Sequence, residues 1–137
     1  MTYRYSICYP DNEDIEYHDT PISGTEVLEL AQNYPWIEQL KLLELTDEVH
    51  YSPSLDFISN ENERSFCLTA IYDKNNNLEF SLWYNRPEKV KVLFGLLGEK
   101  ERMIVDDKWG FSLQQALTYL DYFVNENYAL VERIYEK

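Results

Sequence analysis

Glycine, cysteine and histidine are scarce in this chain of 137 residues. Its four glycines form neither of the glycine-rich motifs that bind nucleotide phosphates. The two histidines, His18 and His50, lie far apart in the sequence. Many zinc sites use two histidines within one helical turn of each other, and neither of these has such a neighbour. Cys8 and Cys67 lie in apolar stretches, so we expect both to be reduced thiols in the core.

The sequence also lacks the signatures of nucleophilic and metal-dependent catalysis. It contains no Gly-x-Ser-x-Gly elbow, and Cys67 lies in an apolar run where burial lowers thiol reactivity. The acidic run from Asp11 begins like a calcium-binding loop, but Glu16 stands where that loop requires glycine. Pairs of carboxylates are uninformative in a chain with 25 acidic residues. We therefore expect no catalytic residue, no metal site and no cofactor.

Basic residues are few, since 12 Lys and Arg stand against 25 Asp and Glu, for a net charge of −13. Such a balance opposes binding to nucleic acids and anionic membranes, which need basic surface. No apolar run approaches the ~18 residues of a membrane span, and we expect a soluble, cytoplasmic protein. The acidity is regional: residues 1–68 carry three basic and fourteen acidic side chains, whereas residues 69–137 carry nine and eleven.

Apolar residues are plentiful, at 45% hydrophobic and 15% aromatic, which acidic disordered chains do not reach. The length suits one folded domain over residues 1–137. Residues 2–9 alternate between tyrosine or isoleucine and polar side chains, which predicts a strand. The acidic stretches at 11–19 and 44–63 read as solvated loops, although a one-sided acidic field is also a signal of interaction.

The next segments give one clear pattern and one ambiguous pattern. Ser23 and Glu26 have the spacing of a capping box, which predicts a helix from about Thr25 to Asn33. Residues 36–45 suit a helix by some of their apolar positions and a strand by others. We favour a strand at 39–45, where leucines alternate around a lysine.

The C-terminal half has clearer strand patterns. Residues 66–72 predict a central strand, residues 73–77 a hairpin turn of Asp, Lys and Asn, and residues 78–84 the returning strand. Further strands are expected at 90–94 and 102–105.

The chain ends with a second clear helix pattern. Ser112 and Gln115 form another capping box before an amphipathic helix that we expect to reach about Asn125, and residues 129–135 predict a closing strand. Two helices with six or seven strands, several of them joined by hairpins, indicate an α+β fold with a mostly antiparallel sheet.

Interleaved acids and tyrosines point to a protein interface. Twelve tyrosines exceed what a core of this size needs, although most could line the edges of the sheet. Acidic side chains would steer a basic partner, and aromatic side chains would anchor it. Turn residues around 53–62 predict exposed acids forming one negative patch, with the acidic run at residues 11–16 as the next candidate. The candidate binding residues are Asp47, Glu48, Tyr51, Asp56, Glu61 and Glu63.

The stretch from residue 66 to the C-terminus resembles the immunity proteins of bacterial polymorphic-toxin and contact-dependent growth inhibition systems. One large group of these carries a late helix, S-x-x-x-A-L-x-x-L-x-x-F, before a final strand. The residues that match this helix are Ser112, Ala116, Leu117, Leu120 and Phe123. The tryptophan often found in the final strand is absent from residues 131–133.

The resemblance implies a cytoplasmic inhibitor, without enzymatic activity, that binds a cognate basic toxin domain of nuclease or deaminase type. The alternative is an acidic adaptor or assembly subunit of an unrelated complex.

Overall fold

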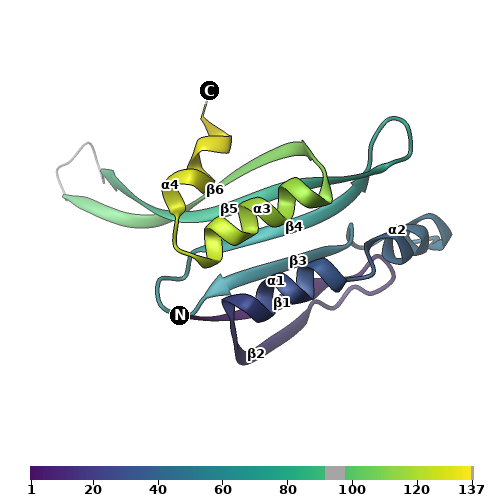
Figure 1. Cartoon of the computed structure of the whole chain (residues 1–137), viewed down its shortest axis with the longest axis horizontal. Helices are drawn as coiled ribbons and strands as arrows, with labels where there is room; N and C mark the ends of the chain where they lie inside the picture. Colours follow the sequence, from purple (N-terminus) through teal and green to yellow (C-terminus); the bar gives the residue numbers. More distant parts are fainter. Residues whose placement is uncertain (92–97, 137) are drawn as a thin grey trace.

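The computed structural model describes residues 1–91 and 98–136. Within these ranges, six strands form one open antiparallel sheet in the order β2-β1-β3-β4-β5-β6 (Figure 1). The α+β fold class is therefore confirmed. The strands are β1 (Thr2–Cys8), β2 (Glu16–Ser23), β3 (Ser54–Ser59), β4 (Ser65–Tyr72), β5 (Leu78–Lys91) and β6 (Glu99–Phe111). The helices are α1 (Gly24–Asn33), α2 (Trp36–Leu45), α3 (Leu113–Val124) and α4 (Tyr128–Glu132), which continues into a 3₁₀ turn at Arg133–Tyr135.

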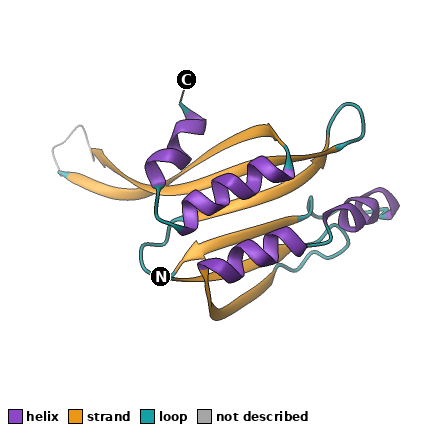
Figure 2. Cartoon of the chain, in the orientation of Figure 1, coloured by secondary structure: helices purple, strands orange, loops and turns teal. Residues whose placement is uncertain are grey.

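The core lies between the sheet and the helices, which pack on one of its faces (Figure 2). In β1, β3, β4 and β5, alternate residues point toward the helices, so apolar side chains on this side of the four strands are buried. Phe123 of α3 contacts aromatic rings from three strands, with ring centroids 5.7 to 6.4 Å apart. The fully buried large side chains include Tyr3, Phe57, Phe66, Leu68, Phe80, Leu82, Tyr84 and Leu120.

Both capping boxes predicted from the sequence are present. Ser23 and Ser112 each accept a hydrogen bond from a backbone N–H three residues on, at 3.1 Å. The side chains of Glu26 and Gln115 accept in return from the backbone N–H groups of the two serines. These reciprocal bonds satisfy helix N–H groups that have no partner within the helix, so the starts of α1 and α3 are encoded locally.

The strand favoured at 39–45 is wrong, because α2 is a helix over this segment. Trp36 and Leu40 are four residues apart and lie on the same side of the helix, 3% and 1% exposed. The Trp36 indole N–H donates to the carbonyl oxygen of Ala31 at 2.9 Å, and its ring meets Phe80 edge-on at 4.9 Å. Burial of Trp36 and Leu40 favours the helix more strongly than the local alternation of leucines favours a strand.

Two strands overlap the segments interpreted as solvated loops, residues 11–19 and 44–63. β2 occupies residues 16–23 as a mostly exposed edge strand, and its polar side chains suit that position. β3 is an interior strand that pairs with β1 and β4. In β3, Leu55 and Phe57 are fully buried on the helix side, while Asp56 points to the opposite face. The polar residue in the middle of this short strand obscured its pattern.

The closing strand expected at 129–135 is also wrong, because this segment is α4 and the 3₁₀ turn. Val131 and Ile134 are buried at a spacing of three, which one side of a helix provides and a strand does not. The hydroxyl of Tyr135 donates to the carbonyl oxygen of Leu82 at 2.9 Å. The final strand expected from the resemblance to immunity proteins is therefore helical.

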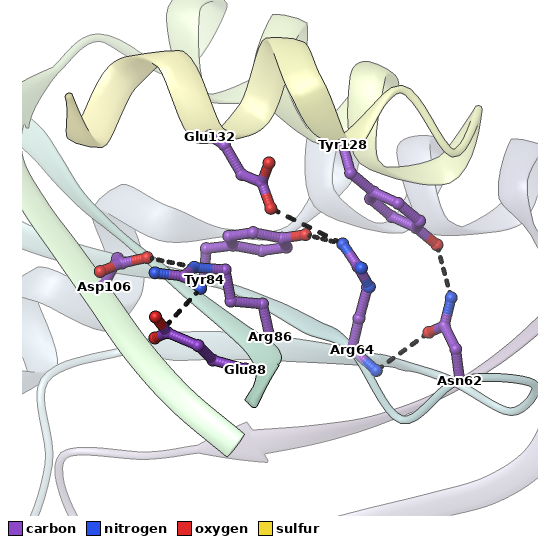
Figure 3. A network of polar contacts seen from close by, with 8 residues as sticks. All are labelled: Asn62, Arg64, Tyr84, Arg86, Glu88, Asp106, Tyr128 and Glu132. Atoms are coloured by element: carbon purple, nitrogen blue, oxygen red, sulfur yellow. Dashed lines mark hydrogen bonds and ion pairs between the residues drawn. The ribbon is translucent and has the colours of Figure 1, made fainter. Parts of the chain in front are cut away.

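Polar contacts hold α4 against the sheet (Figure 3). The Arg64 guanidinium donates to the hydroxyl of Tyr84 at 2.6 Å, lies 3.8 Å from a carboxylate oxygen of Glu132, and stacks 4.2 Å from the ring centre of Tyr128. Asn62 donates to the Tyr128 hydroxyl at 2.9 Å. The turn between β3 and β4 is thus attached to α4 rather than free in solvent.

β5 and β6 are longer than the separate strands expected from the sequence. The expected strands at 78–84 and 90–91 are one strand, β5, while residues 92–94 lie outside the described ranges. The expected strand at 102–105 is part of β6. Pairing between β4 and β5 ends at Asn85, so the following residues pair only with β6. Pro87 lies in this two-stranded part, where the absent N–H interrupts no central ladder.

Candidate functional site

The six candidate binding residues do not form one patch. A strand of six residues spans about 20 Å, and β3 separates the two ends where most of the candidates lie. Asp56 was expected to be exposed, but it lies within β3 and is half-buried, with its Oδ1 atom fully buried. The candidates before β3 are Asp47, Glu48 and Tyr51, and those after it are Glu61 and Glu63.

The acids before β3 lie beside those of the turn between β1 and β2. The backbone N–H of His50 donates to the carbonyl oxygen of Pro10 at 3.0 Å. The Tyr51 hydroxyl donates to the carbonyl oxygen of Glu13 at 3.1 Å. These bonds join two segments that sequence analysis treated as alternatives. We call the surface formed by these two segments the acidic end. Its exposed acidic residues are Asp11, Glu13, Asp14, Asp47 and Glu48.

The carboxylates of the acidic end are not neutralised by basic side chains of the described residues. Within residues 1–91 and 98–136, none of its five carboxylates forms an ion pair. The acids at the other end of β3 differ, because Glu63 forms an ion pair with Arg4 and Glu61 lies 3.9 Å from the N-terminal amine. The acidic end is therefore less neutralised by ion pairs than the turn at Glu61 and Glu63.

The sheet face opposite the helices carries a second feature, a hollow of about 290 Å³. Ser65, Cys67 and Thr69 alternate along β4 and form its floor, since small side chains leave space above a strand. Asp56 of β3 forms one wall. The opposite wall consists of Trp83 and Asn85 of β5 and Val105 of β6.

Strand register explains how these residues meet. Asp56 pairs directly with Cys67, Cys67 with Trp83, and Trp83 with Asp107, so the four side chains form one row across the sheet. Directly paired residues lie on the same face, here the face without helices. Both cysteines are free, and Cys67 lines the hollow instead of the helix-covered core expected for it.

Two acceptors in the hollow have no hydrogen-bond partner among residues 1–91 and 98–136. They are the Oδ1 atoms of Asp56 and Asn85, which are both buried. Burial raises the pKa of Asp56 to about 6, and the nearby Arg4 guanidinium opposes this only in part. Unsatisfied buried acceptors are uncommon in folded proteins and often mark a place where another group binds.

Trp83 lines the hollow on the side of β5 and β6, and Trp109 of β6 packs against Trp83. The Trp83 indole N–H donates to the hydroxyl oxygen of Ser81 at 2.9 Å. Trp109 meets Trp83 edge-on at 6.4 Å and is 54% exposed. Trp83 was not among the binding residues predicted from the sequence, although it alternates with Leu82 and Tyr84, which are buried on the other side of β5. A tryptophan among polar residues of a strand was the available signal.

The chemistry of the hollow favours binding over catalysis. Burial and the neighbouring carboxyl of Asp56 raise the pKa of the Cys67 thiol, so the reactive thiolate is disfavoured. No cluster of potential metal ligands occurs in the described part of the chain. What the hollow offers is two hydrogen-bond acceptors and an aromatic surface, a set that suits a ligand rich in donors.

No known protein family, curated protein or solved structure matches this chain. Among the helices at residues 1–91 and 98–136, none is long and apolar enough to cross a membrane.

Proposed function

We propose that this chain is an acidic immunity protein that binds and neutralises a basic toxin domain of nuclease or deaminase type in the cytoplasm. The acidic end supports this proposal most directly. It gathers five exposed carboxylates from two separate chain segments, with no ion pair among them in the described residues. A toxin that acts on nucleic acid needs a positive surface, and an acidic protein competes for that surface.

We expect the acidic end to affect the rate of association with the toxin as well as the affinity. Single exposed ion pairs contribute only about 0.2–1 kcal/mol, so no single carboxylate of the acidic end should dominate. A cluster of like charges instead creates a field that accelerates association with an oppositely charged protein. This field is screened over about 8 Å at physiological salt, so its effect depends strongly on ionic strength.

The alternative is an acidic adaptor or assembly subunit. The same surface would serve a basic partner of any kind, and the acidic end does not specify a toxin. The two proposals differ in gene context, because an immunity protein is expected beside a toxin reading frame. They also differ in effect, because only an immunity protein restores growth to cells that produce that toxin.

The test uses the catalytically inactive product of the adjacent toxin reading frame and stopped-flow association kinetics. Converting Asp11, Glu13, Asp14, Asp47 and Glu48 to Asn or Gln should slow association about tenfold or more at low salt and flatten its salt dependence. The matched control removes five exposed acids that lie elsewhere, so the net charge changes equally. The control residues are Glu29, Glu38, Glu101, Glu126 and Glu136.

The control separates a local field from total charge. The proposal predicts a much smaller effect in the control variant than in the acidic-end variant. Equal rates in the two variants would move the interface away from the acidic end. Absence of any binding, together with no protection of growth against the adjacent gene product, would contradict the immunity function itself.

A further inference from the structure

We propose that the hollow on the helix-free face of the sheet receives one arginine side chain of a basic partner protein. The guanidinium would donate to Asp56 and Asn85 and lie against the indole of Trp83. The identity of the partner that carries this arginine rests on the proposed function. Binding of an arginine side chain in the hollow can be tested without any partner.

The size of the hollow limits its occupant. Pockets for drug-sized ligands have volumes of about 300–1,000 Å³, and 290 Å³ lies at the bottom of that range. The hollow therefore suits one long side chain better than a nucleotide or a larger cofactor. It is formed on a sheet surface, so a side chain carried by another protein can enter from solvent.

The two unpartnered acceptors favour a donor with several N–H groups. Asp56 and Asn85 lie on β3 and β5, on either side of β4. Their backbones are at least about 9.6 Å apart, because they lie two strand spacings apart and Asn85 is two residues along β5 from Trp83, the member of the Asp56 row. One compact ammonium group is therefore poorly shaped to serve both side chains. A guanidinium presents five N–H donors in a planar fork and can bond in two directions at once. Arginine therefore fits this pair of acceptors better than lysine.

The electrostatics of the hollow favour a cation. Asp56 is part of the wall, and Asp107 lies in the same cross-strand row. Arg4, the cation that acts on Asp56, already bonds to Asn60 and Glu63. Its guanidinium thus offsets the charge of Asp56 only in part.

The aromatic wall fits the same ligand. A guanidinium is planar and weakly hydrated, and it stacks readily on tryptophan. Trp83 presents such a surface inside the hollow, and the exposed Trp109 extends it. Acceptors on two sides and an aromatic surface on one side are the elements of an arginine site.

The first test is a two-dimensional NMR titration of the whole protein with N-acetyl-arginine amide. We expect shifts of the Trp83 indole N–H and the Asn85 side-chain amide, with a dissociation constant of about 1–20 mM. N-acetyl-citrulline amide has nearly the same shape without the charge, and should bind at least about tenfold more weakly. N-acetyl-lysine amide at matched ionic strength tests the preference for the planar group. No shifts at 100 mM arginine amide, or equal binding of the citrulline compound, would overturn the proposal.

Variants assign the binding to the hollow. Asp56→Asn and Asn85→Ala should each weaken arginine amide at least about fivefold. The acidic-end variant keeps the hollow intact and should bind arginine amide as the wild type does. Unchanged affinity in both hollow variants would refute the assignment, as would shifts confined to the acidic end.

The outcomes separate this inference from the immunity function. A toxin whose affinity is unchanged by Asp56→Asn and Asn85→Ala contradicts the arginine site and leaves the immunity function standing. Arginine amide that binds in the hollow of a protein with no toxin partner supports the site and contradicts the immunity function.

Discussion

Asp56→Asn should stabilise the protein at neutral pH, which is unusual for the replacement of a half-buried side chain in an interior strand. The Asp56 carboxylate is held in the hollow, where one of its oxygens has no hydrogen-bond partner. Burial raises its pKa from 3.8 to about 6, with Arg4 acting in the opposite direction. The folded protein thus holds a proton on Asp56 more tightly than the unfolded chain does.

The sign and size of the effect follow from this difference in pKa. Between about pH 4 and pH 6 the folded state binds more protons, so Asp56 makes stability fall as pH rises through this window. Above about pH 6 the ionised Asp56 lowers the free energy of unfolding by its full amount, and below about pH 4 this destabilisation is absent. Two pKa units at 1.36 kcal/mol each correspond to about 3 kcal/mol. The buried amide keeps a polar cost of its own, so we expect a gain of about 1–3 kcal/mol at pH 7.5.

Urea denaturation at pH 7.5 and pH 4.5 measures this gain. The variant should exceed the wild type at pH 7.5, and the difference should shrink by more than half at pH 4.5. Other titrating groups are common to both proteins and cancel in the comparison. Asp107→Asn is the control, because it removes an exposed carboxylate from the same face and should change stability by less than about 0.5 kcal/mol.

Two results would refute the reasoning about Asp56. One is an Asp56→Asn variant less stable than the wild type at pH 7.5, which would mean that the carboxylate makes favourable contacts in the free protein. The other is a gain that is the same at both pH values, which would mean that protonation of Asp56 plays no part. A confirmed gain would show that the chain keeps a destabilising carboxylate, as binding sites often do.

Three further predictions concern the thiols and α3. Thiol titration of the denatured, unreduced protein should find two free thiols, from Cys8 and Cys67, and one thiol or none would show a disulfide. Leu120→Ala should cost about 2–5 kcal/mol in urea denaturation because this side chain is fully buried, and the partly buried Leu117→Ala should cost less. Equal losses would contradict the orientation of α3. Ser112→Ala should cost about 1 kcal/mol through loss of the cap, and an unchanged midpoint would mean that the cap contributes nothing.

The elements that sequence analysis predicted well are those with local determinants. The capping boxes at Ser23 and Ser112 define the starts of α1 and α3 through bonds within four residues. The alternation in β1 and in the first half of β5 reflects burial of one side of each strand. Such signals depend on neighbours in the chain and can be read without knowing the fold.

The elements predicted wrongly depend on distant contacts. The apolar pattern of α2 is compatible with a helix or a strand, and the contact of Trp36 with Phe80 across the core favours the helix. The last segment forms a helix because its apolar side chains pack under α3 and its polar ones meet Arg64 of a different turn. Neither partner is visible in a local window, so tertiary packing decides both cases.

The hollow was beyond local prediction for a related reason. Asp56, Cys67 and Asn85 come from three segments that meet only through the pairing register of β3, β4 and β5. A shift of one residue in any of these strands would turn its side chains to the helix-covered face and remove the hollow. The available signal in the local sequence was the acidic Asp56, which interrupts the apolar residues Leu55, Phe57 and Ile58 of β3. A charged residue kept inside a strand at a cost in stability is a stronger indication of a binding site than the exposed acids around it, since exposed acids serve solubility as readily as recognition.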